Sequence, residues 1–173
     1  YDLSEPQFRL FLEKFPGHTL EANANYHLIQ CLRFQNKIAE MLTAIRRFRE
    51  QWPQHDEMPT LTLLEADTLF NAGDYAAAAT CYQQLTQSRD QQRQELAKYF
   101  LAQCYAQTGH AEEAMALYRE LDALPLQDDR PYRFYAKFEL ARINQRQNRF
   151  AEAEAGFARL ADQPKSDELV TPI

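Results

Sequence analysis

The residues able to carry out chemistry are few and widely spaced along the chain. No two of the histidines form a His-x-x-x-His pair, the spacing that places two zinc ligands on one helix face. They are His18, His27, His55 and His110. His55-Asp56-Glu57 groups three possible ligands, but consecutive side chains diverge at a helix start, so we interpret the segment as a solvated cap. No glycine-rich phosphate-binding loop occurs. The sequence predicts no catalytic residues, no metal site and no cofactor.

The other reactive side chains also favour structural roles. His110-Ala-Glu-Glu113 lies at an expected helix start, where acids interact favourably with the helix dipole. Asp128-Asp129 falls in an expected loop at 125–131, and a catalytic carboxylate pair would need a pocket around it. The cysteines are odd in number and lack CxxC spacing, so we interpret them as buried thiols that favour a reducing compartment. They are Cys31, Cys81 and Cys104.

Composition and charge narrow the classes of partner. The net charge of −6 and the lack of a basic stripe argue against nucleic-acid binding, which depends on phosphate contacts. No apolar run approaches the length of a membrane span. Arg46-Arg47-Arg49 is the one basic run, interpreted as a solvated helix face, with a partner or anionic-surface contact as the alternative. The chain begins at Tyr1 inside an expected helix, so we interpret it as a segment of a longer protein.

One sequence block recurs along the chain, and its copies start at Asn36, Gly73, Gly109 and Asn148. Asn and Gly suit the left-handed backbone of a tight turn between helices. An apolar residue follows two positions after each opener, then a small residue, then an aromatic residue or Ile. Their steps of three and four residues place these side chains on one helix face.

A second amphipathic stretch precedes each block and completes a helical hairpin. Seven residues before the openers lie Ile29, Ala66, Ala102 and Ala141, and a small residue there lets two helices approach closely. The predicted fold class is therefore all-α, an α-solenoid of tandem antiparallel helical hairpins in one repeat domain over residues 1–173. Its parts are a half repeat at 4–15, hairpins at about 20–52, 57–88, 93–124 and 132–163, and a tail at 164–173.

The block Gly-x-Tyr-x-x-Ala-x-x-x-Tyr, with Ala seven residues before its Gly, resembles the tetratricopeptide repeat (TPR). The resemblance covers residues 20–163 and is strongest in the second and third copies. It implies a right-handed superhelix whose first helices line a concave groove for an extended or helical peptide. The long repeat periods, and the Pro after two second helices (Phe15-Pro16 and Trp52-Pro53), resemble bacterial envelope proteins. Outer-membrane assembly lipoproteins and the Tol-Pal-associated coordinator are examples.

The resemblance, carried over position by position, implies a set of partner-binding residues on the first helices. They are Tyr26, Gln30, Arg33, Asp67, Phe70, Asn71, Tyr99, Gln103, Tyr135, Phe138, Arg142 and Arg146. We take Tyr26, Tyr99 and Tyr135 as equivalent positions that project to one side as anchors. Arg142 would hold a carboxylate, so an apolar and partly acidic segment is expected as partner. The alternative for Phe70 and Phe138 is that they pack neighbouring repeats.

The expected function is a non-catalytic protein–protein interaction scaffold within a larger assembly. The narrower resemblance implies an assembly of the cell envelope. One alternative is a self-association module that forms a homo-oligomer through its terminal hairpins, because solenoid ends without polar caps associate readily. Another is a targeting or regulatory domain of a larger enzyme. The bacterial periplasm or cell envelope is the favoured location, and the cytoplasm is the alternative.

Overall fold

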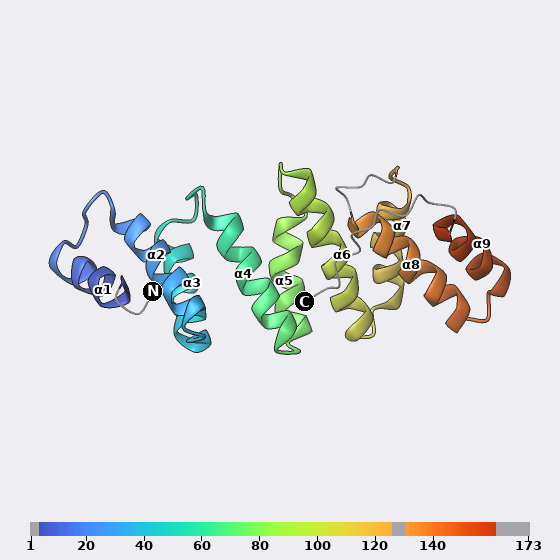
Figure 1. The fold of residues 1–173 in the computed structure, drawn as a ribbon, viewed down its shortest axis with the longest axis horizontal. Helices are drawn as coiled ribbons and strands as arrows, with labels where there is room; N and C mark the ends of the chain where they lie inside the picture. Colours follow the sequence, from blue (N-terminus) through green and yellow to red (C-terminus); the bar gives the residue numbers. More distant parts are fainter. Residues whose placement is uncertain (1–3, 126–130, 162–173) are drawn as a thin grey trace. The chain divides into compact units, whose positions relative to one another are not determined.

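The computed structural model describes residues 4–125 and 131–161, which form nine α-helices and no β-strand (Figure 1). The helices are α1 Ser4–Lys14, α2 Glu21–Phe34, α3 Ile38–Gln51, α4 Met58–Asn71, α5 Tyr75–Leu85, α6 Gln91–Gln107, α7 Ala111–Asp122, α8 Pro131–Arg146 and α9 Phe150–Ala161. Short turns join most of them, as tandem hairpins require. The predicted all-α class is confirmed.

Two consecutive helices lie in each segment for which the sequence predicts a hairpin. Both helices of a pair fall inside 20–52 and inside 57–88. In the last two segments, 93–124 and 132–163, the first helix begins slightly before the predicted start, at Gln91 and at Pro131. The predicted half repeat at 4–15 is α1. The predicted tail at 164–173 and residues 126–130 of the predicted loop lie outside the described residues.

The turn within each hairpin uses the left-handed backbone conformation that its opening residue suggested. Asn36 and Asn148 have φ of 56° and 60°, and Gly73 and Gly109 have φ of 80° and 84°. After three of these openers the next residue donates its N–H to the carbonyl five residues earlier, as in a Schellman motif. The pairs are Lys37 to Leu32, His110 to Tyr105 and Arg149 to Asn144. This bond ends the first helix and turns the chain back.

The chain divides into two compact units, Tyr1–Gly73 (unit 1) and Asp74–Ile173 (unit 2). Among the described helices, unit 1 contains α1 to α4 and unit 2 contains α5 to α9. The boundary falls at the turn between α4 and α5, inside the predicted hairpin 57–88. A single repeat domain over 1–173 stays a prediction.

The core of unit 1 lies where α2 meets α3 and α4. Its fully buried side chains include Ile29 and Leu32 of α2, Met41, Ile45 and Phe48 of α3, and Leu61 of α4. The steps between Met41, Ile45 and Phe48 are those of one helix face, as the sequence pattern predicted. The ring of Trp52, which follows α3, packs on Phe48 with a centroid distance of 5.0 Å.

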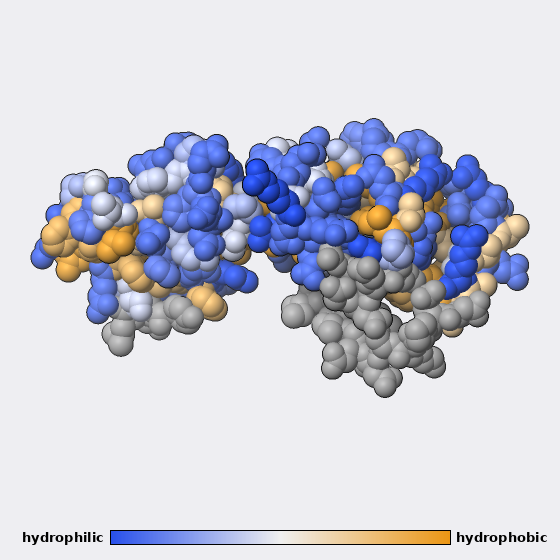
Figure 2. All heavy atoms as spheres, turned by 90° about the horizontal axis from the view of Figure 1, so that it is seen from above, coloured by the Kyte–Doolittle hydropathy of each residue, from blue (hydrophilic) through white to orange (hydrophobic). Residues whose placement is uncertain are grey.

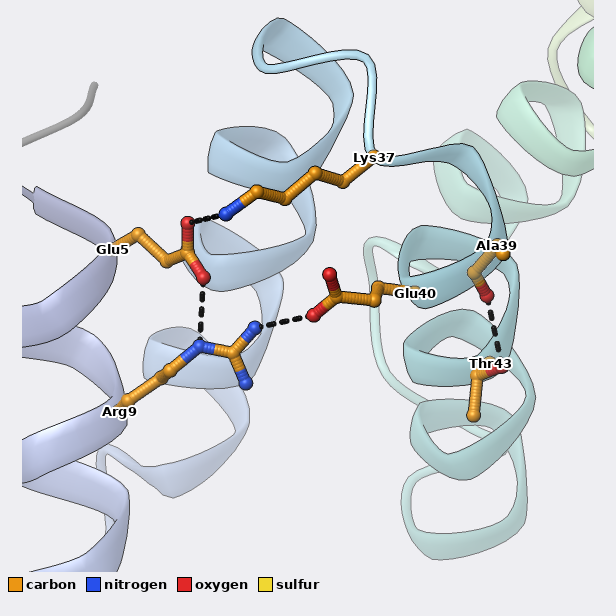
Figure 3. Close-up of polar contacts among 6 residues, drawn as sticks. All are labelled: Glu5, Arg9, Lys37, Ala39, Glu40 and Thr43. Atoms are coloured by element: carbon orange, nitrogen blue, oxygen red, sulfur yellow. Dashed lines mark hydrogen bonds and ion pairs between the residues drawn. The ribbon is translucent and has the colours of Figure 1, made fainter.

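An ion network attaches α1 to the next hairpin (Figure 3). The Glu5 carboxylate, 10% exposed, accepts from Arg9 Nε and Lys37 Nζ, each at 2.7 Å. Arg9 Nη2 in turn donates to Glu40 Oε2 at 2.7 Å. These hydrogen bonds to Lys37 and Arg9 lower the pKa of Glu5 to about 2. The half repeat is therefore held by charge as well as by Phe8 and Leu12, which pack against the unit 1 core.

The core of unit 2 combines large rings with small side chains. Ala102 of α6, Ala114 of α7 and Ala136 of α8 are fully buried and pack with Tyr99, Tyr118 and Leu121. Ala102 and Ala114, the small residues at fixed offsets from the opener Gly109, both belong to this core. In the last hairpin, a Cβ on Gly156 would lie 2.9 Å from Ala141 Cβ, so these two helices pack closely at that point.

The surface in the view of Figure 2 is mostly hydrophilic, and hydrophobic residues gather at the α1 end of unit 1. Leu10 of α1, and Phe15 and Leu20 between α1 and α2, are exposed large apolar side chains. Within the described residues, no helix is both long and apolar enough to span a bilayer.

Candidate functional site

The first helices of consecutive hairpins in unit 2, α6 and α8, are in direct contact, and we refer to their adjoining faces as the unit 2 surface. This unit 2 surface carries half of the predicted site residues: Tyr99, Gln103, Tyr135, Phe138, Arg142 and Arg146. The two helices are also held by α7, which packs against both.

Ion pairs fix α8 on the rest of unit 2. Arg133 donates to both oxygens of Glu95 on α6 at 2.8 and 2.6 Å, and each side chain is 3% exposed. Arg133 also donates to the Pro125 carbonyl. Lys137 donates to the Asp122 side chain and carbonyl at the end of α7, at 2.7 and 2.6 Å. A buried pair with both partners satisfied favours one helix register, so the side chains on α8 are presented in a defined position.

Tyr99 occupies the centre of this surface but is largely buried, with 8% of its area exposed. Its hydroxyl accepts from Gln103 Nε2 at 2.6 Å, and its ring lies 5.8 Å from the Tyr135 ring and 5.6 Å from Tyr132. Burial, and then the nearby Glu139 carboxylate, raise the pKa of Tyr99 to about 12. The ring therefore belongs to the core and offers a partner little area.

Tyr135 is not at a position equivalent to Tyr26 and Tyr99, in contrast to the expectation from the repeat. Tyr99 lies ten residues before the opener Gly109, and ten residues before Asn148 lies Phe138 instead of Tyr135. Phe138 is 41% exposed and packs on Phe157 of α9 at 5.7 Å. Tyr135 lies about one turn earlier on α8 and is partly buried against Tyr99. The exposed aromatic of this surface is thus Phe138.

Glu139 is a residue that the sequence interpretation missed. Its side chain is 13% exposed, and its Oε2 lies 2.8 Å from Arg142 Nη2. Burial raises the pKa of Glu139, and the charges of Arg142 and Arg146 oppose that effect. A signal was present in the sequence, because Glu139 is the one acid in a helix with four basic residues.

Two of those four basic residues remain accessible on α8. Arg133 is buried against Glu95, and Lys137 is engaged by Asp122. Arg142 has 45% of its side chain exposed and Arg146 is also exposed. The accessible part of the unit 2 surface therefore combines an aromatic ring, Phe138, with two guanidinium groups on the next turns.

The other six predicted site residues lie in unit 1. Tyr26 and Gln30 on α2 are partly buried, whereas Arg33 is exposed. Burial and the neighbouring Glu57 carboxylate raise the pKa of Tyr26. On α4, Asp67 and Phe70 are partly buried and Asn71 is exposed. Phe15 and Phe34, the latter at the end of α2, are exposed aromatic residues of this unit.

The reactive groups considered from sequence are dispersed in the structure. No group of three or more His, Cys, Asp or Glu side chains suited to a metal ion occurs among the residues described. His18, His55 and His110 each pack on an aromatic ring next to a turn. The three cysteines are buried, and burial raises the pKa of Cys104 to about 12, which disfavours its reactive thiolate.

The sequence profile of the tetratricopeptide repeat family matches residues 63–131, which include α5, α6 and α7. Residues 63–131 are thus similar in sequence to tetratricopeptide repeats. TPR segments generally mediate protein–protein interaction, and α6 contributes the first helix of the unit 2 surface. No curated protein matches the sequence. The narrower likeness to envelope lipoproteins stays a prediction.

Solved structures support the TPR fold over most of the chain. TPR-like repeats of a candidate kinesin light chain from Podosopora anserina superpose with a TM-score of 0.69 at 16% identity, covering 92% of this chain and 83% of that one. A single-residue variant of that protein superposes with a TM-score of 0.68 at 16% identity, covering 92% of this chain and 82% of that one. A double mutant of RS-1 MamA superposes with a TM-score of 0.68 at 13% identity, covering 91% of this chain and 82% of that one. At these identities the likeness shows the fold alone.

Proposed function

We propose that the chain is a non-catalytic protein-binding scaffold and that the unit 2 surface receives an extended or helical segment of its partner. The TPR match supports the class of function. The segment would carry apolar side chains for Phe138 and acidic groups for Arg142 and Arg146. Aromatic and arginine side chains dominate binding energy at protein interfaces, and here they lie on neighbouring turns of one helix.

The exposure of Phe138 is the observation that carries this proposal. A large ring that is 41% exposed, on a helix otherwise held by buried ion pairs, offers apolar area at little further ordering cost. Arg142 follows one turn later and can donate to a carboxylate through two nitrogens. Tyr26, Gln30, Arg33, Asp67, Phe70 and Asn71 of unit 1 are proposed as a second contact region.

A peptide-display selection against the full chain, followed by affinity measurement, tests the proposal. The double variant Phe138→Ala with Arg142→Gln should bind the selected peptides more weakly by about 2 kcal/mol or more, with an unchanged far-ultraviolet circular dichroism spectrum. Arg119→Gln on the exposed face of α7 is the matched control and should leave affinity unchanged. Full-strength binding by the double variant would direct attention to Arg46, Arg47 and Arg49 of α3.

Self-association is the second candidate function, and the exposed apolar residues near α1 favour it. Leu10, Phe15 and Leu20 each have about half of their area exposed. Contacts between such residues in two copies would make the sedimentation coefficient rise with protein concentration. A constant coefficient over a wide concentration range would exclude this alternative. A cell-envelope location is a further proposal, tested by fractionation of cells that produce the protein. A role as a targeting domain in a larger enzyme is another, tested by whether the full reading frame encodes a catalytic domain beside this segment.

A further inference from the structure

Glu139 lies beneath the accessible part of the unit 2 surface, in the middle of α8. Its charge acts on Tyr99 of α6 and Tyr118 of α7, and the guanidinium groups of Arg142 and Arg146 of α8 act on it in turn. The charged residues of α9, Glu152, Glu154 and Arg159, are exposed. The ion pair with Arg142 is thus a close charged contact of a largely buried carboxylate.

Arg142 is shared between this carboxylate and the surface. One of its nitrogens, Nη2, contacts Glu139 at 2.8 Å, while 45% of the side chain is exposed. A carboxylate of a partner that reaches Arg142 would bring a second negative charge close to Glu139 and would compete for the same guanidinium. Two carboxylates around one cation in a partly buried site disfavour the state in which both are charged.

Resting on the proposed function, we propose that Glu139 couples the binding of an acidic segment at Arg142 to the uptake of one proton. The proton comes from solvent and binds the Glu139 carboxylate, which becomes a neutral carboxylic acid as the partner's carboxylate takes its place on Arg142. The partner is therefore an acidic protein segment whose affinity for the unit 2 surface depends on pH.

The direction of the pH effect follows from linkage. If the complex holds more protons than the free components, affinity rises as pH falls, by at most about tenfold per pH unit for one proton. Burial already raises the pKa of Glu139 in the free chain, and the partner's negative charge raises it further. Acidic side chains of a peptide keep their charge above about pH 5.5, so the peptide's own titration contributes little there.

The probe is a blocked twelve-residue peptide of leucine, phenylalanine and glutamate, with a matched peptide that has lysine in place of glutamate. Isothermal titration of the full chain at pH 5.5 and pH 7.5 should show the acidic peptide binding about threefold or more tightly at the lower pH. At pH 7.5, titrations in phosphate and in Tris, which differ in ionisation enthalpy, should report net proton uptake.

The variant Glu139→Gln removes the titration while keeping the side-chain shape. It should bind the acidic peptide at pH 7.5 about as tightly as the unaltered chain does at pH 5.5, and the pH dependence should be lost. The exposed acid Glu152→Gln is the control and should retain the pH dependence. If Glu139→Gln does not fold, the proton uptake of the unaltered chain decides the question alone.

The outcomes separate this inference from the proposed function. Binding of the acidic peptide with equal affinity at both pH values and no proton uptake would overturn the inference and leave the binding function intact. Preference for the lysine peptide would overturn the acidic partner as well. If neither peptide binds at either pH, the unit 2 surface is not a peptide-binding site, and the inference and its parent proposal are both wrong.

Discussion

At the scale of single residues, position in the repeat was easier to predict than exposure. Tyr99 lies where the tetratricopeptide pattern places a groove residue, yet Tyr132 and Tyr135 of the next first helix pack around it. Exposure depends on the size of neighbours that are more than thirty residues away in the sequence. The small residues were predictable, because Ala102 and Ala114 lie at fixed offsets from Gly109 and are both fully buried.

Ala114 provides a direct test of that register. Its side chain is 1% exposed and packs in the core between Tyr99, Tyr118 and Ala136. Ala114→Leu should lower the free energy of unfolding by about 1–3 kcal/mol, because a close-packed site has no room for the added carbons. Urea denaturation measures the change. Ala116→Leu, on the exposed face of the same helix, should change stability by less than about 0.5 kcal/mol, and equal effects of both substitutions would contradict the register.

The buried pair of Glu95 with Arg133 should show how strongly α8 depends on one contact. Glu95→Gln leaves the Arg133 guanidinium buried without its counter-charge, at a cost of about 3–5 kcal/mol in unfolding free energy. Lys98→Gln breaks a more exposed pair with Glu120 and should cost at most about 1 kcal/mol. Denaturant titration of both variants provides the comparison, and similar losses would show that burial of the first pair has little influence.

At the scale of helices, the sequence predicted hairpins and turns but not the polar contacts between them. The openers Asn36 and Asn148 indicated left-handed turns, because few residues other than Gly and Asn adopt that conformation readily. Contacts such as Glu95 with Arg133 join residues one repeat apart, and the repeat pattern does not distinguish which polar side chains face inward. The same limit applies to Glu139, whose burial follows from how α8 packs against α6 and α7.

The attachment of α1 should depend on pH through Glu5. The pKa of this carboxyl is lowered from 4.5 to about 2 in the folded chain, so its stabilising effect is present above pH 4.5 and is lost as pH falls towards 2. Since its ion-pair partners are partly exposed, we expect the loss to be about 1–2 kcal/mol. Hydrogen exchange of the α1 amides against pH measures it. Glu5→Gln should remove this part of the acid dependence, whereas Glu13→Gln, on an exposed part of α1, should retain it.

At the scale of the whole chain, a helical repeat protein has mostly local contacts. Within each unit, the described helices contact their immediate neighbours in sequence. The one longer-range pair with substantial contact among them is α6 with α8. The stability of such arrays is approximately a sum over repeats and their interfaces. A change in one unit should therefore be felt chiefly within that unit.

Ala114→Leu also tests this locality. Native-state hydrogen exchange followed by mass spectrometry should show faster exchange in α6, α7 and α8 of unit 2 and unchanged exchange in α2 and α3 of unit 1. The difference in opening free energy should be about 1–3 kcal/mol in unit 2. Equal acceleration in both units would indicate that the chain opens as one cooperative structure.

Because Trp52 packs on Phe48 in the folded chain, its fluorescence reports on the folding of unit 1. Trp52 is the chain's one tryptophan and lies in unit 1, whereas seven of its nine tyrosines lie in unit 2. Excitation at the red edge of the absorption band selects the indole and so reads unit 1, while near-ultraviolet tyrosine signals read chiefly unit 2. The melting of the two units can therefore be followed separately in the unmodified protein, without dyes or added probes.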